Sequence, residues 1–126
     1  FFFIGEPPIT DTEWGIWKVE TNLRTGAIKG RHGENGCLQI TRAAFIDSRV
    51  EGGYERTAEL GFSIEVFRAY IKRWCSKKRL GREATLRDIC YCWNGGAGFQ
   101  RASKAKRQRL ETYYQKVKRA IEGRRE

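Results

Sequence analysis

The sequence predicts a mainly helical domain of the α+β class, with a small glycine-rich lobe that is either a loop or a β-hairpin. Three observations support this class: apolar residues recur at helical spacing, capping residues precede the apolar segments, and glycines gather between residues 22 and 36. A chain of 126 residues has the size of one domain. We therefore expect a single domain over residues 1–126, with residues 1–10 as an N-terminal arm.

The first helix is expected to begin at Asp11, which can act as its cap, and to end near Thr21. Its inward side should carry Trp14, Trp17 and Val19. Glu20 then lies in the last turn of this helix. The residues that follow, 22–36, contain Gly26, Gly30, Gly33 and Gly36. This composition is typical of tight turns or a small hairpin.

Two helices are expected in the middle of the chain. Thr41 is a good cap for a short helix, which Gly52 and Gly53 should stop. Ser63 should open a longer amphipathic helix that ends near Gly81, after a basic last turn. Its apolar stripe consists of Ile64, Phe67, Tyr70, Ile71, Trp74 and Cys75.

Two more helices are expected towards the C-terminus. Thr85 and Asp88 resemble a capping box, which predicts a short helix as far as Trp93. A glycine-rich turn over residues 94–98 should follow. The apolar stripe of the final helix consists of Leu110, Tyr113, Tyr114, Val117 and Ile121.

The chain carries a formal net charge of +10, from 25 Lys and Arg against 15 Asp and Glu. Seven basic residues and no acidic one lie over residues 68–82, and residues 101–126 contain ten basic and three acidic ones. Two basic helical faces would suit an anionic polymer: nucleic acid, an anionic membrane face or a bacterial cell wall. Charge alone does not choose among these, and a solvated face that keeps the protein soluble is the alternative.

No apolar run approaches the roughly 20 residues that a transmembrane helix needs. The apolar residues 1–4 are followed at once by Gly, Glu and two Pro at positions 5–8. We expect neither a transmembrane segment nor an intact targeting peptide in this chain.

The four cysteines of the chain are Cys37, Cys75, Cys90 and Cys92. They form no Cys-x-x-Cys pair and His32 is the one histidine, so we expect no metal site. Cys90 and Cys92 would point to different sides of a helix, so each would need a separate partner. Buried free thiols and one or two disulfides both remain open.

Glu20 has the sequence surroundings of a carboxylic acid that keeps its proton. Trp14, Trp17 and Val19 are near it in sequence, and apolar surroundings raise a carboxyl pKa by disfavouring the charged form. Cleavage of a glycosidic bond needs such an acid to protonate the leaving oxygen. Taken alone, however, a glutamate at a helix end is usually an exposed surface residue.

Three segments change this interpretation when they are taken together: residues 19–21 (VET), 36–40 (GCLQI) and 93–98 (WNGGAG). Their order and spacing resemble the SLT-type lytic transglycosylase family, in which a helix-ending Glu-Ser precedes a Gly-Leu-Met-Gln segment and a later Tyr-Asn-Ala-Gly segment. They also resemble invertebrate-type lysozymes, which have Gly-Pro-Phe-Gln-Ile and Asn-Gly-Gly segments. Goose-type lysozymes share the same general scaffold. The resemblance spans residues 14–121 and implies a lysozyme-like fold.

The resemblance assigns a role to each matching residue. Glu20 matches the catalytic acid, Gln39 matches the glutamine that lines the cleft, and Asn94 matches the asparagine of the late motif. Trp93 stands where transglycosylases usually have Tyr, and Gly95 where they have Ala. The residues expected to bind substrate are Gln39, Tyr91, Trp93, Asn94 and Gly95.

The chain also departs from the family pattern. Thr21 replaces the serine that commonly follows the acid, and Cys37 stands near the usual glycine or proline, which leaves the path of that loop open. Aromatic rings can stack against sugar faces, and each candidate ring is alternatively part of the core. These candidates are Tyr54, Tyr91, Trp93 and Phe99.

A second carboxylate is expected if the protein resembles the invertebrate-type lysozymes, which carry an Asp in the loop after the Glu; transglycosylases of this type generally work without one. The corresponding loop here offers Glu34, which we predict to be the second catalytic residue, with an exposed turn residue as the alternative. Asp47 is another possibility, but it lies on the following helix and should face solvent.

The resemblance implies a muramidase or lytic transglycosylase that cuts peptidoglycan strands without a cofactor. Its expected partners are glycan strands and the anionic cell-wall surface, its expected state is monomeric, and its expected location is periplasmic or secreted. Two alternatives remain: a basic nucleic-acid-binding module, supported by charge alone, and a lysozyme-like domain that binds glycan without cleaving it. The presence of Glu20 argues against the second alternative.

Overall fold

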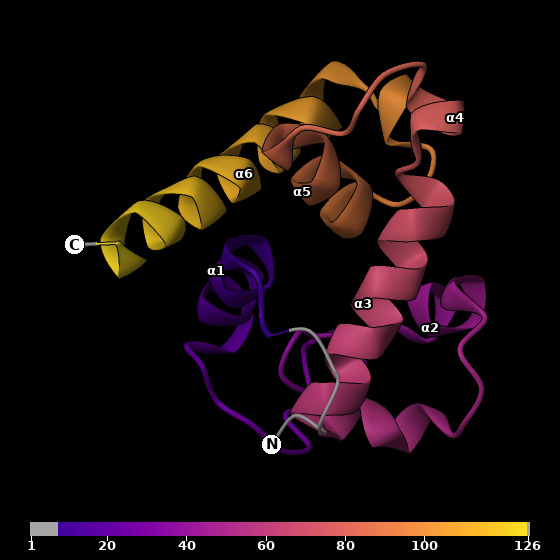
Figure 1. The fold of residues 1–126 in the computed structure, drawn as a ribbon, viewed down its shortest axis with the longest axis vertical. Coiled ribbons are helices and arrows are strands. Elements are labelled where there is room, and N and C mark those ends of the chain that lie inside the picture. The colour runs from indigo at the N-terminus through magenta and orange to yellow at the C-terminus, as the bar shows by residue number, and fades with distance from the viewer. Residues whose placement is uncertain (1–7, 126) are drawn as a thin grey trace.

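The computed structural model describes residues 8–125 and is mainly helical, as the sequence predicts (Figure 1). The α-helices are α1 (Asp11–Thr21), α2 (Arg42–Ser48), α3 (Leu60–Trp74), α4 (Lys77–Leu80), α5 (Leu86–Gly95) and α6 (Lys104–Arg124). Two short 3-10 helices, η1 (Tyr54–Ala58) and η2 (Phe99–Arg101), lie between them. Most of the expected N-terminal arm, residues 1–7, lies outside the described residues.

The cap of α1 is Thr10, and the prediction of Asp11 was wrong by one position. The Thr10 hydroxyl accepts a hydrogen bond from the Glu13 backbone N–H at 3.2 Å, and the Glu13 carboxylate accepts one from the Thr10 N–H at 2.9 Å. This reciprocal pair is a capping box, which needs a Glu at the third helical position and therefore selects Thr10.

The buried face of α1 is formed by Gly15 and Ile16, whereas Trp14 stays partly exposed. A Cβ at Gly15 would lie 2.7 Å from Cγ1 of Ile121 on α6. The absence of a side chain at position 15 thus lets α1 and α6 pack closely. The other two residues expected on the inward side, Trp17 and Val19, are partly buried against the core.

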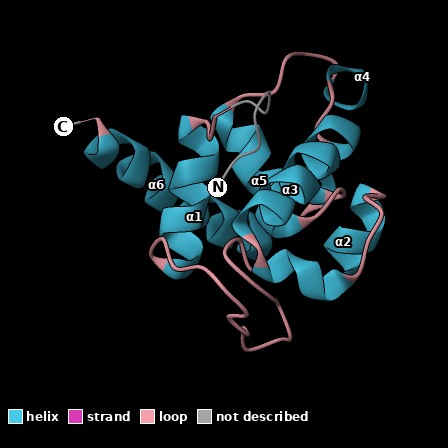
Figure 2. Cartoon of the chain, turned by 60° about the horizontal axis from the view of Figure 1, so that its bottom comes forward, coloured by secondary structure: helices cyan, strands magenta, loops and turns pink. Residues whose placement is uncertain are grey.

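The glycine-rich segment is a loop and contains no named strand within the described residues (Figure 2). Two isolated bridges, Lys29 to Asn35 and Asn35 to Ile40, are the trace of a hairpin. Gly36 has a φ of 81° and its missing Cβ would overlap the backbone carbonyl of Thr57. Only glycine fits at this position, where the loop folds back against η1.

The caps explain where α2 and α3 begin. Thr41 caps α2 as predicted, because its hydroxyl accepts a hydrogen bond from the Ala44 N–H at 3.1 Å. Helix α3 begins at Leu60, earlier than the predicted Ser63. Ser63 is already inside the helix, since its N–H donates to the carbonyl of Glu59 at 2.9 Å.

The helix expected to continue to Gly81 is divided into α3 and α4. It stops at Trp74, where Cys75 leaves helical geometry with φ −117° and ψ 34°. The Ser76 hydroxyl then accepts a hydrogen bond from the Arg79 N–H at 3.3 Å and starts α4 as a new helix. Gly81 ends α4 in the left-handed conformation, with a φ of 78°.

Helix α5 starts with the predicted capping box. The Asp88 N–H donates to the Thr85 hydroxyl at 3.2 Å, and the Thr85 N–H donates to the Asp88 carboxylate at 2.9 Å. The helix continues through Gly95, beyond the predicted end at Trp93, so Asn94 lies in its last turn. The predicted apolar stripe of α6 is buried in full: Leu110, Tyr113, Tyr114, Val117 and Ile121.

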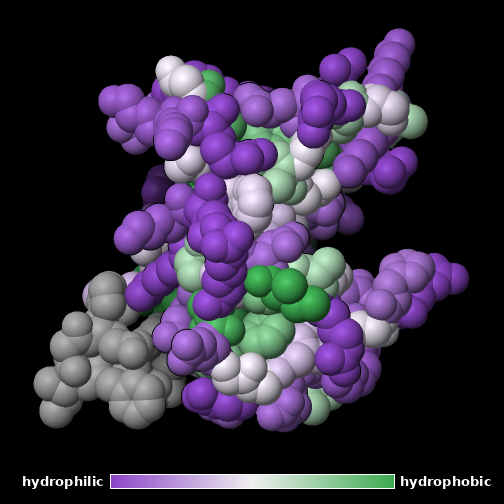
Figure 3. Space-filling view, turned by 90° about the vertical axis from the view of Figure 1, so that its right-hand side faces the viewer, coloured by the Kyte–Doolittle hydropathy of each residue, from purple (hydrophilic) through white to green (hydrophobic). Residues whose placement is uncertain are grey.

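The core is enclosed by the larger helices, with α6 packed along α1 and α5 (Figure 1). Its fully buried large side chains include Ile16, Leu38, Ile40, Ile64, Val66, Leu110 and Val117. On the face seen in Figure 3, hydrophilic residues cover most of the surface, and the most apolar residues gather below the middle of the view. Among the described residues, no helix is long and apolar enough to span a membrane.

Candidate active site

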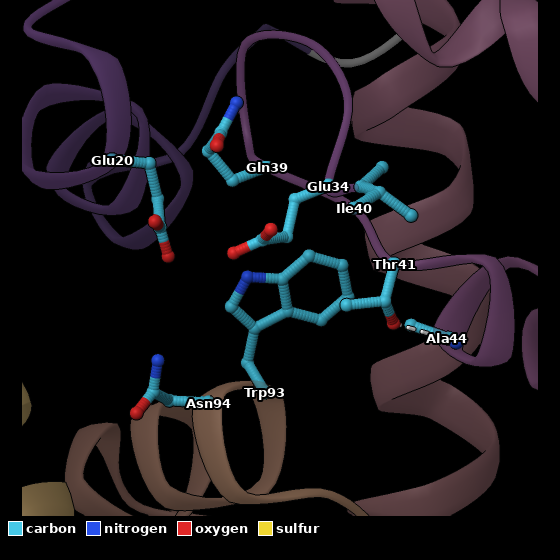
Figure 4. Close-up of a pocket in the computed structure, with 8 residues that line it drawn as sticks. All are labelled: Glu20, Glu34, Gln39, Ile40, Thr41, Ala44, Trp93 and Asn94. Carbon is cyan, nitrogen blue, oxygen red and sulfur yellow. Dashed lines mark hydrogen bonds between the residues drawn. The ribbon is translucent and has the colours of Figure 1, made fainter. Parts of the chain in front are cut away.

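A cavity of about 150 Å³ lies where the end of α1, the residues before α2 and the end of α5 meet (Figure 4). It is lined by Glu20, Glu34, Gln39, Ile40, Thr41, Ala44, Trp93 and Asn94. The three sequence segments singled out above, which are far apart in the chain, therefore each contribute residues to one cavity.

Glu20 enters the cavity from the last turn of α1, and its carboxylate points into the open space (Figure 4). The hydroxyl of Tyr113 on α6 donates a hydrogen bond to Oε2 of Glu20 at 2.8 Å. One oxygen of the carboxylate is thus held by the protein, and the carboxyl group has a defined orientation towards the cavity.

The surroundings of Glu20 raise its pKa from 4.5 to about 7. Burial is the main cause, because it disfavours the charged form, and the nearby Glu34 carboxylate adds to it by repulsion. The hydrogen bond from Tyr113 acts in the opposite direction. Near neutral pH a substantial part of Glu20 therefore carries a proton that it can donate.

Tyr113 remains a hydrogen-bond donor because it does not ionise. Burial raises the pKa of its hydroxyl well above 10, and the adjacent Glu20 carboxylate raises it further. Sequence reasoning placed Tyr113 in an apolar stripe and missed its hydroxyl. The available signal was the residue type, since a buried tyrosine hydroxyl usually has a polar partner.

Glu34 faces Glu20 across the cavity, and the Trp93 ring lies below the Glu34 carboxylate in the view of Figure 4. One oxygen of Glu34 accepts a hydrogen bond from the backbone N–H of His32 at 2.6 Å. This bond is made within the turn and orients the carboxylate. A Cβ at Gly30 would lie 2.8 Å from the same Glu34 oxygen, so the glycine leaves room for this arrangement.

The side chain of Gln39 stabilises the loop through hydrogen bonds and presents one polar atom to the cavity. Its backbone has a φ of 53°, and its amide nitrogen donates to the carbonyls of Ile28 at 2.8 Å and Gly36 at 2.9 Å. The amide nitrogen is thus engaged by the protein. Its side-chain oxygen is the atom that can accept a hydrogen bond from a ligand in the cavity.

Thr21 and Cys37 connect the helix end to the loop. The Thr21 hydroxyl donates a buried hydrogen bond to the Cys37 carbonyl at 2.8 Å. The side chain of Cys37 is fully buried and its thiol points to the carbonyl of Ala58 at 3.8 Å. Cys37 is therefore accommodated in the core, and the hydrogen bond from Thr21 ties the loop to the end of α1.

Trp93 and Asn94 come from the last turns of α5. The Trp93 ring meets Phe67 and Tyr70 edge to face, with centroid distances of 5.0 and 5.4 Å. These contacts fix the indole at the base of the cavity. Asn94 is exposed, and its side chain points towards Glu20 in Figure 4.

Two residues expected to bind substrate lie elsewhere. Tyr91 points to α6, where its hydroxyl donates to Glu111. Gly95 lines a neighbouring hollow of about 250 Å³ and packs against Leu110, whose Cδ1 would lie 2.8 Å from a Cβ at this position. The alternative carboxylate Asp47 is exposed and borders the same neighbouring hollow.

The cavity thus brings together a carboxylic acid with a raised pKa and a second carboxylate opposite it. The acid can protonate a leaving group, and the second carboxylate can stabilise a positive charge that develops between them. Within residues 8–125, no three His, Cys, Asp or Glu side chains meet in a group that could hold a metal ion. Neither a family model nor a curated protein matches this sequence.

Proposed function

We propose that this protein is a peptidoglycan-cleaving glycosidase, a muramidase or lytic transglycosylase with a lysozyme-like fold. It cuts the β-1,4 bond between N-acetylmuramic acid and N-acetylglucosamine. The observation that carries the proposal is the position of Glu20, whose pKa is about 7, opposite Glu34 in the same cavity.

The reaction starts with protonated Glu20, which gives its proton to the glycosidic oxygen as the bond to the sugar carbon breaks. Positive charge then develops on the sugar ring, and the Glu34 carboxylate opposite stabilises it. Glu20, now a carboxylate, accepts a proton from the attacking hydroxyl. That hydroxyl belongs to water in a muramidase and to the sugar itself in a lytic transglycosylase.

The remaining cavity residues hold the sugar. Trp93 offers an aromatic surface at the base of the cavity, while Asn94 and the side-chain oxygen of Gln39 offer hydrogen bonds to hydroxyl or acetamido groups. The basic helices α4 and α6 favour an anionic cell wall as the partner, so the proposed site of action is the periplasm or the outside of the cell.

The test is digestion of purified peptidoglycan by the Glu20→Gln variant, which removes the titrating proton with little change of shape. Loss of general acid catalysis should reduce the rate by about a hundred- to ten-thousand-fold. Turbidity of a cell-wall suspension measures the rate, and a helical circular dichroism spectrum verifies the fold. Glu65→Gln, an exposed glutamate on α3, is the matched control and should keep full activity.

The masses of the products identify the reaction. Anhydro ends, lighter by one water, indicate a transglycosylase, and hydrated ends indicate a muramidase. Activity of Glu20→Gln within a few-fold of the parent would contradict the proposed function. If the parent protein does not digest the cell wall, and Glu20→Gln binds nucleic acid as well as the parent does, the nucleic-acid-binding module is favoured instead.

A further inference from the structure

Tyr54 is the first residue of η1, and its side chain reaches the loop that carries Glu34 and Gln39. Only 8% of its surface is exposed, and its ring packs in the main core against Phe45, with a centroid distance of 5.8 Å. Tyr54 does not line the cavity. This candidate for stacking against a sugar is therefore a core residue, and only its hydroxyl is placed to act on the site.

The Tyr54 hydroxyl lies within hydrogen-bond distance of two backbone carbonyls of the loop, those of Ile40 at 2.5 Å and Gly33 at 3.1 Å. The Gly33 carbonyl belongs to the peptide bond that leads into Glu34. The Ile40 carbonyl also accepts a hydrogen bond at 3.0 Å from the N–H of Asn35, the residue that follows Glu34. The hydroxyl thus anchors the backbone on both sides of Glu34.

Tyr54 keeps its proton and so remains a donor to these carbonyls. Burial raises its pKa, the guanidinium of Arg42 acts in the opposite direction, and the Glu34 carboxylate raises the pKa further. Arg42 lies over the Tyr54 ring at 4.4 Å and adds a cation–π contact that helps to hold the ring in place.

The hydrogen bond that orients the Glu34 carboxylate does not fix its position in the cavity. That bond comes from the N–H of His32 at 2.6 Å, within the same turn, so a turn that shifts as a whole carries both partners with it. Contacts from the loop to the rest of the protein must set the position. Thr57 of η1 holds the side chain of Asn35 at 2.9 Å, whereas Tyr54 holds the backbone itself.

We propose that Tyr54 is a positioning residue: through the backbone it keeps the Glu34 carboxylate opposite Glu20, where positive charge develops on the sugar during cleavage. This inference rests on the proposed function, in which Glu34 stabilises that charge. Such stabilisation depends on a fixed geometry, and a misplacement of about 1 Å can cost about a hundredfold in rate. Tyr54 itself touches no substrate and acts through Glu34.

The first test is Tyr54→Phe, which removes the hydroxyl and keeps the ring with its contacts to Phe45 and Arg42. In the digestion of peptidoglycan, kcat should fall about tenfold while KM changes little, because the sugar-binding residues on α5 are unaffected. Tyr114→Phe on α6 is the matched control and should keep both constants. Circular dichroism and the melting temperature verify that both variants are folded.

The second test separates positioning from a purely structural role. Combined with Glu34→Gln, Tyr54→Phe should cause no further loss of kcat, because the charge that the hydroxyl positions is already absent. A residue that only stabilises the fold would lower kcat by the same factor with and without the Glu34 carboxylate, and that result would overturn the proposal. An unchanged kcat in Tyr54→Phe alone would overturn it too.

The third test does not depend on activity. The Glu34 carboxylate raises the pKa of Glu20 by repulsion, so a displaced Glu34 should lower that pKa. NMR titration of the Glu20 carboxyl carbon should show a lower pKa in Tyr54→Phe than in the parent, and no such change in Tyr114→Phe. An unchanged pKa of Glu20 would overturn the proposal. A parent that digests no peptidoglycan would contradict the proposed function, and the titration would still decide whether Tyr54 positions Glu34.

Discussion

Replacement of Tyr113 by phenylalanine should raise the pKa of Glu20 and allow activity at higher pH. The change removes the hydroxyl that donates to Oε2 of Glu20 at 2.8 Å and keeps the buried ring. That bond stabilises the carboxylate, so its loss favours the protonated acid. In the proposed mechanism, activity requires protonated Glu20 and is lost as the pH rises through about 7.

The size of the effect follows from the strength of such a bond. A hydrogen bond to a charged group contributes about 1.5–3 kcal/mol, and a tenfold change in proton affinity corresponds to about 1.4 kcal/mol. Because Glu20 is partly exposed to the cavity, the lower part of this range applies. We expect the alkaline limit of the activity to move upward by about one pH unit.

The assay is the initial rate of turbidity loss of a cell-wall suspension, measured against pH at constant ionic strength. Tyr114→Phe is the matched control, because Tyr114 is the next residue on α6 and its ring faces Arg87 at 4.5 Å. Its profile should be that of the parent. An unchanged or lowered alkaline limit in Tyr113→Phe would refute the assignment of Glu20 as the acid that Tyr113 adjusts.

Three further predictions concern the same site and the basic surface. Glu34→Gln should slow cleavage less than Glu20→Gln and lower the alkaline limit, since the repulsion that raises the pKa of Glu20 is removed; unchanged rates and pH profile would exclude Glu34 from the mechanism. Gly30→Ala should reduce activity without unfolding the protein, because its Cβ would lie 2.3 Å from the side-chain oxygen of Gln39 and 2.8 Å from an oxygen of Glu34 and must displace both cavity side chains. Gly61→Ala, whose Cβ meets open space, should keep full activity; turbidity measures the activity and circular dichroism the fold. Sedimentation with insoluble peptidoglycan should show weaker binding as salt is added, because charges are screened over about 8 Å at physiological ionic strength. An unchanged bound fraction would mean that the basic faces are not the docking surface.

Local sequence signals predicted the helices well but not all of their ends. Thr41 and the Thr85–Asp88 capping box mark true starts, because a cap depends only on neighbouring residues. The division between α3 and α4 was missed, since an apolar stripe continues through Cys75 even though Ser76 starts a new helix there. The periodicity of apolar residues does not show where one helix ends and the next begins when both helices share one apolar stripe.

Residues of the candidate site could be predicted from the sequence where the short segment around them identifies them. Glu20, Glu34, Gln39, Trp93 and Asn94 all line the cavity. Tyr91 does not, and its distance of two positions from Trp93 on one helix already places the two side chains on different sides. Tyr113 could not be assigned to Glu20 because the two residues are 93 positions apart, and only the packing of α6 on α1 brings them together.

The packing of α6 on α1 also affects the pKa of Glu20. Because Gly15 has no side chain, α6 approaches α1 so closely that a Cβ at position 15 would lie 2.7 Å from Ile121. The same close packing brings the Tyr113 hydroxyl within hydrogen-bond distance of Glu20. A larger residue at position 15 would separate the two helices and stretch that hydrogen bond. The spacing of two helices, set outside the cavity, therefore tunes the acidity of a group inside it, and variation at position 15 can shift the useful pH range while every residue of the cavity stays the same.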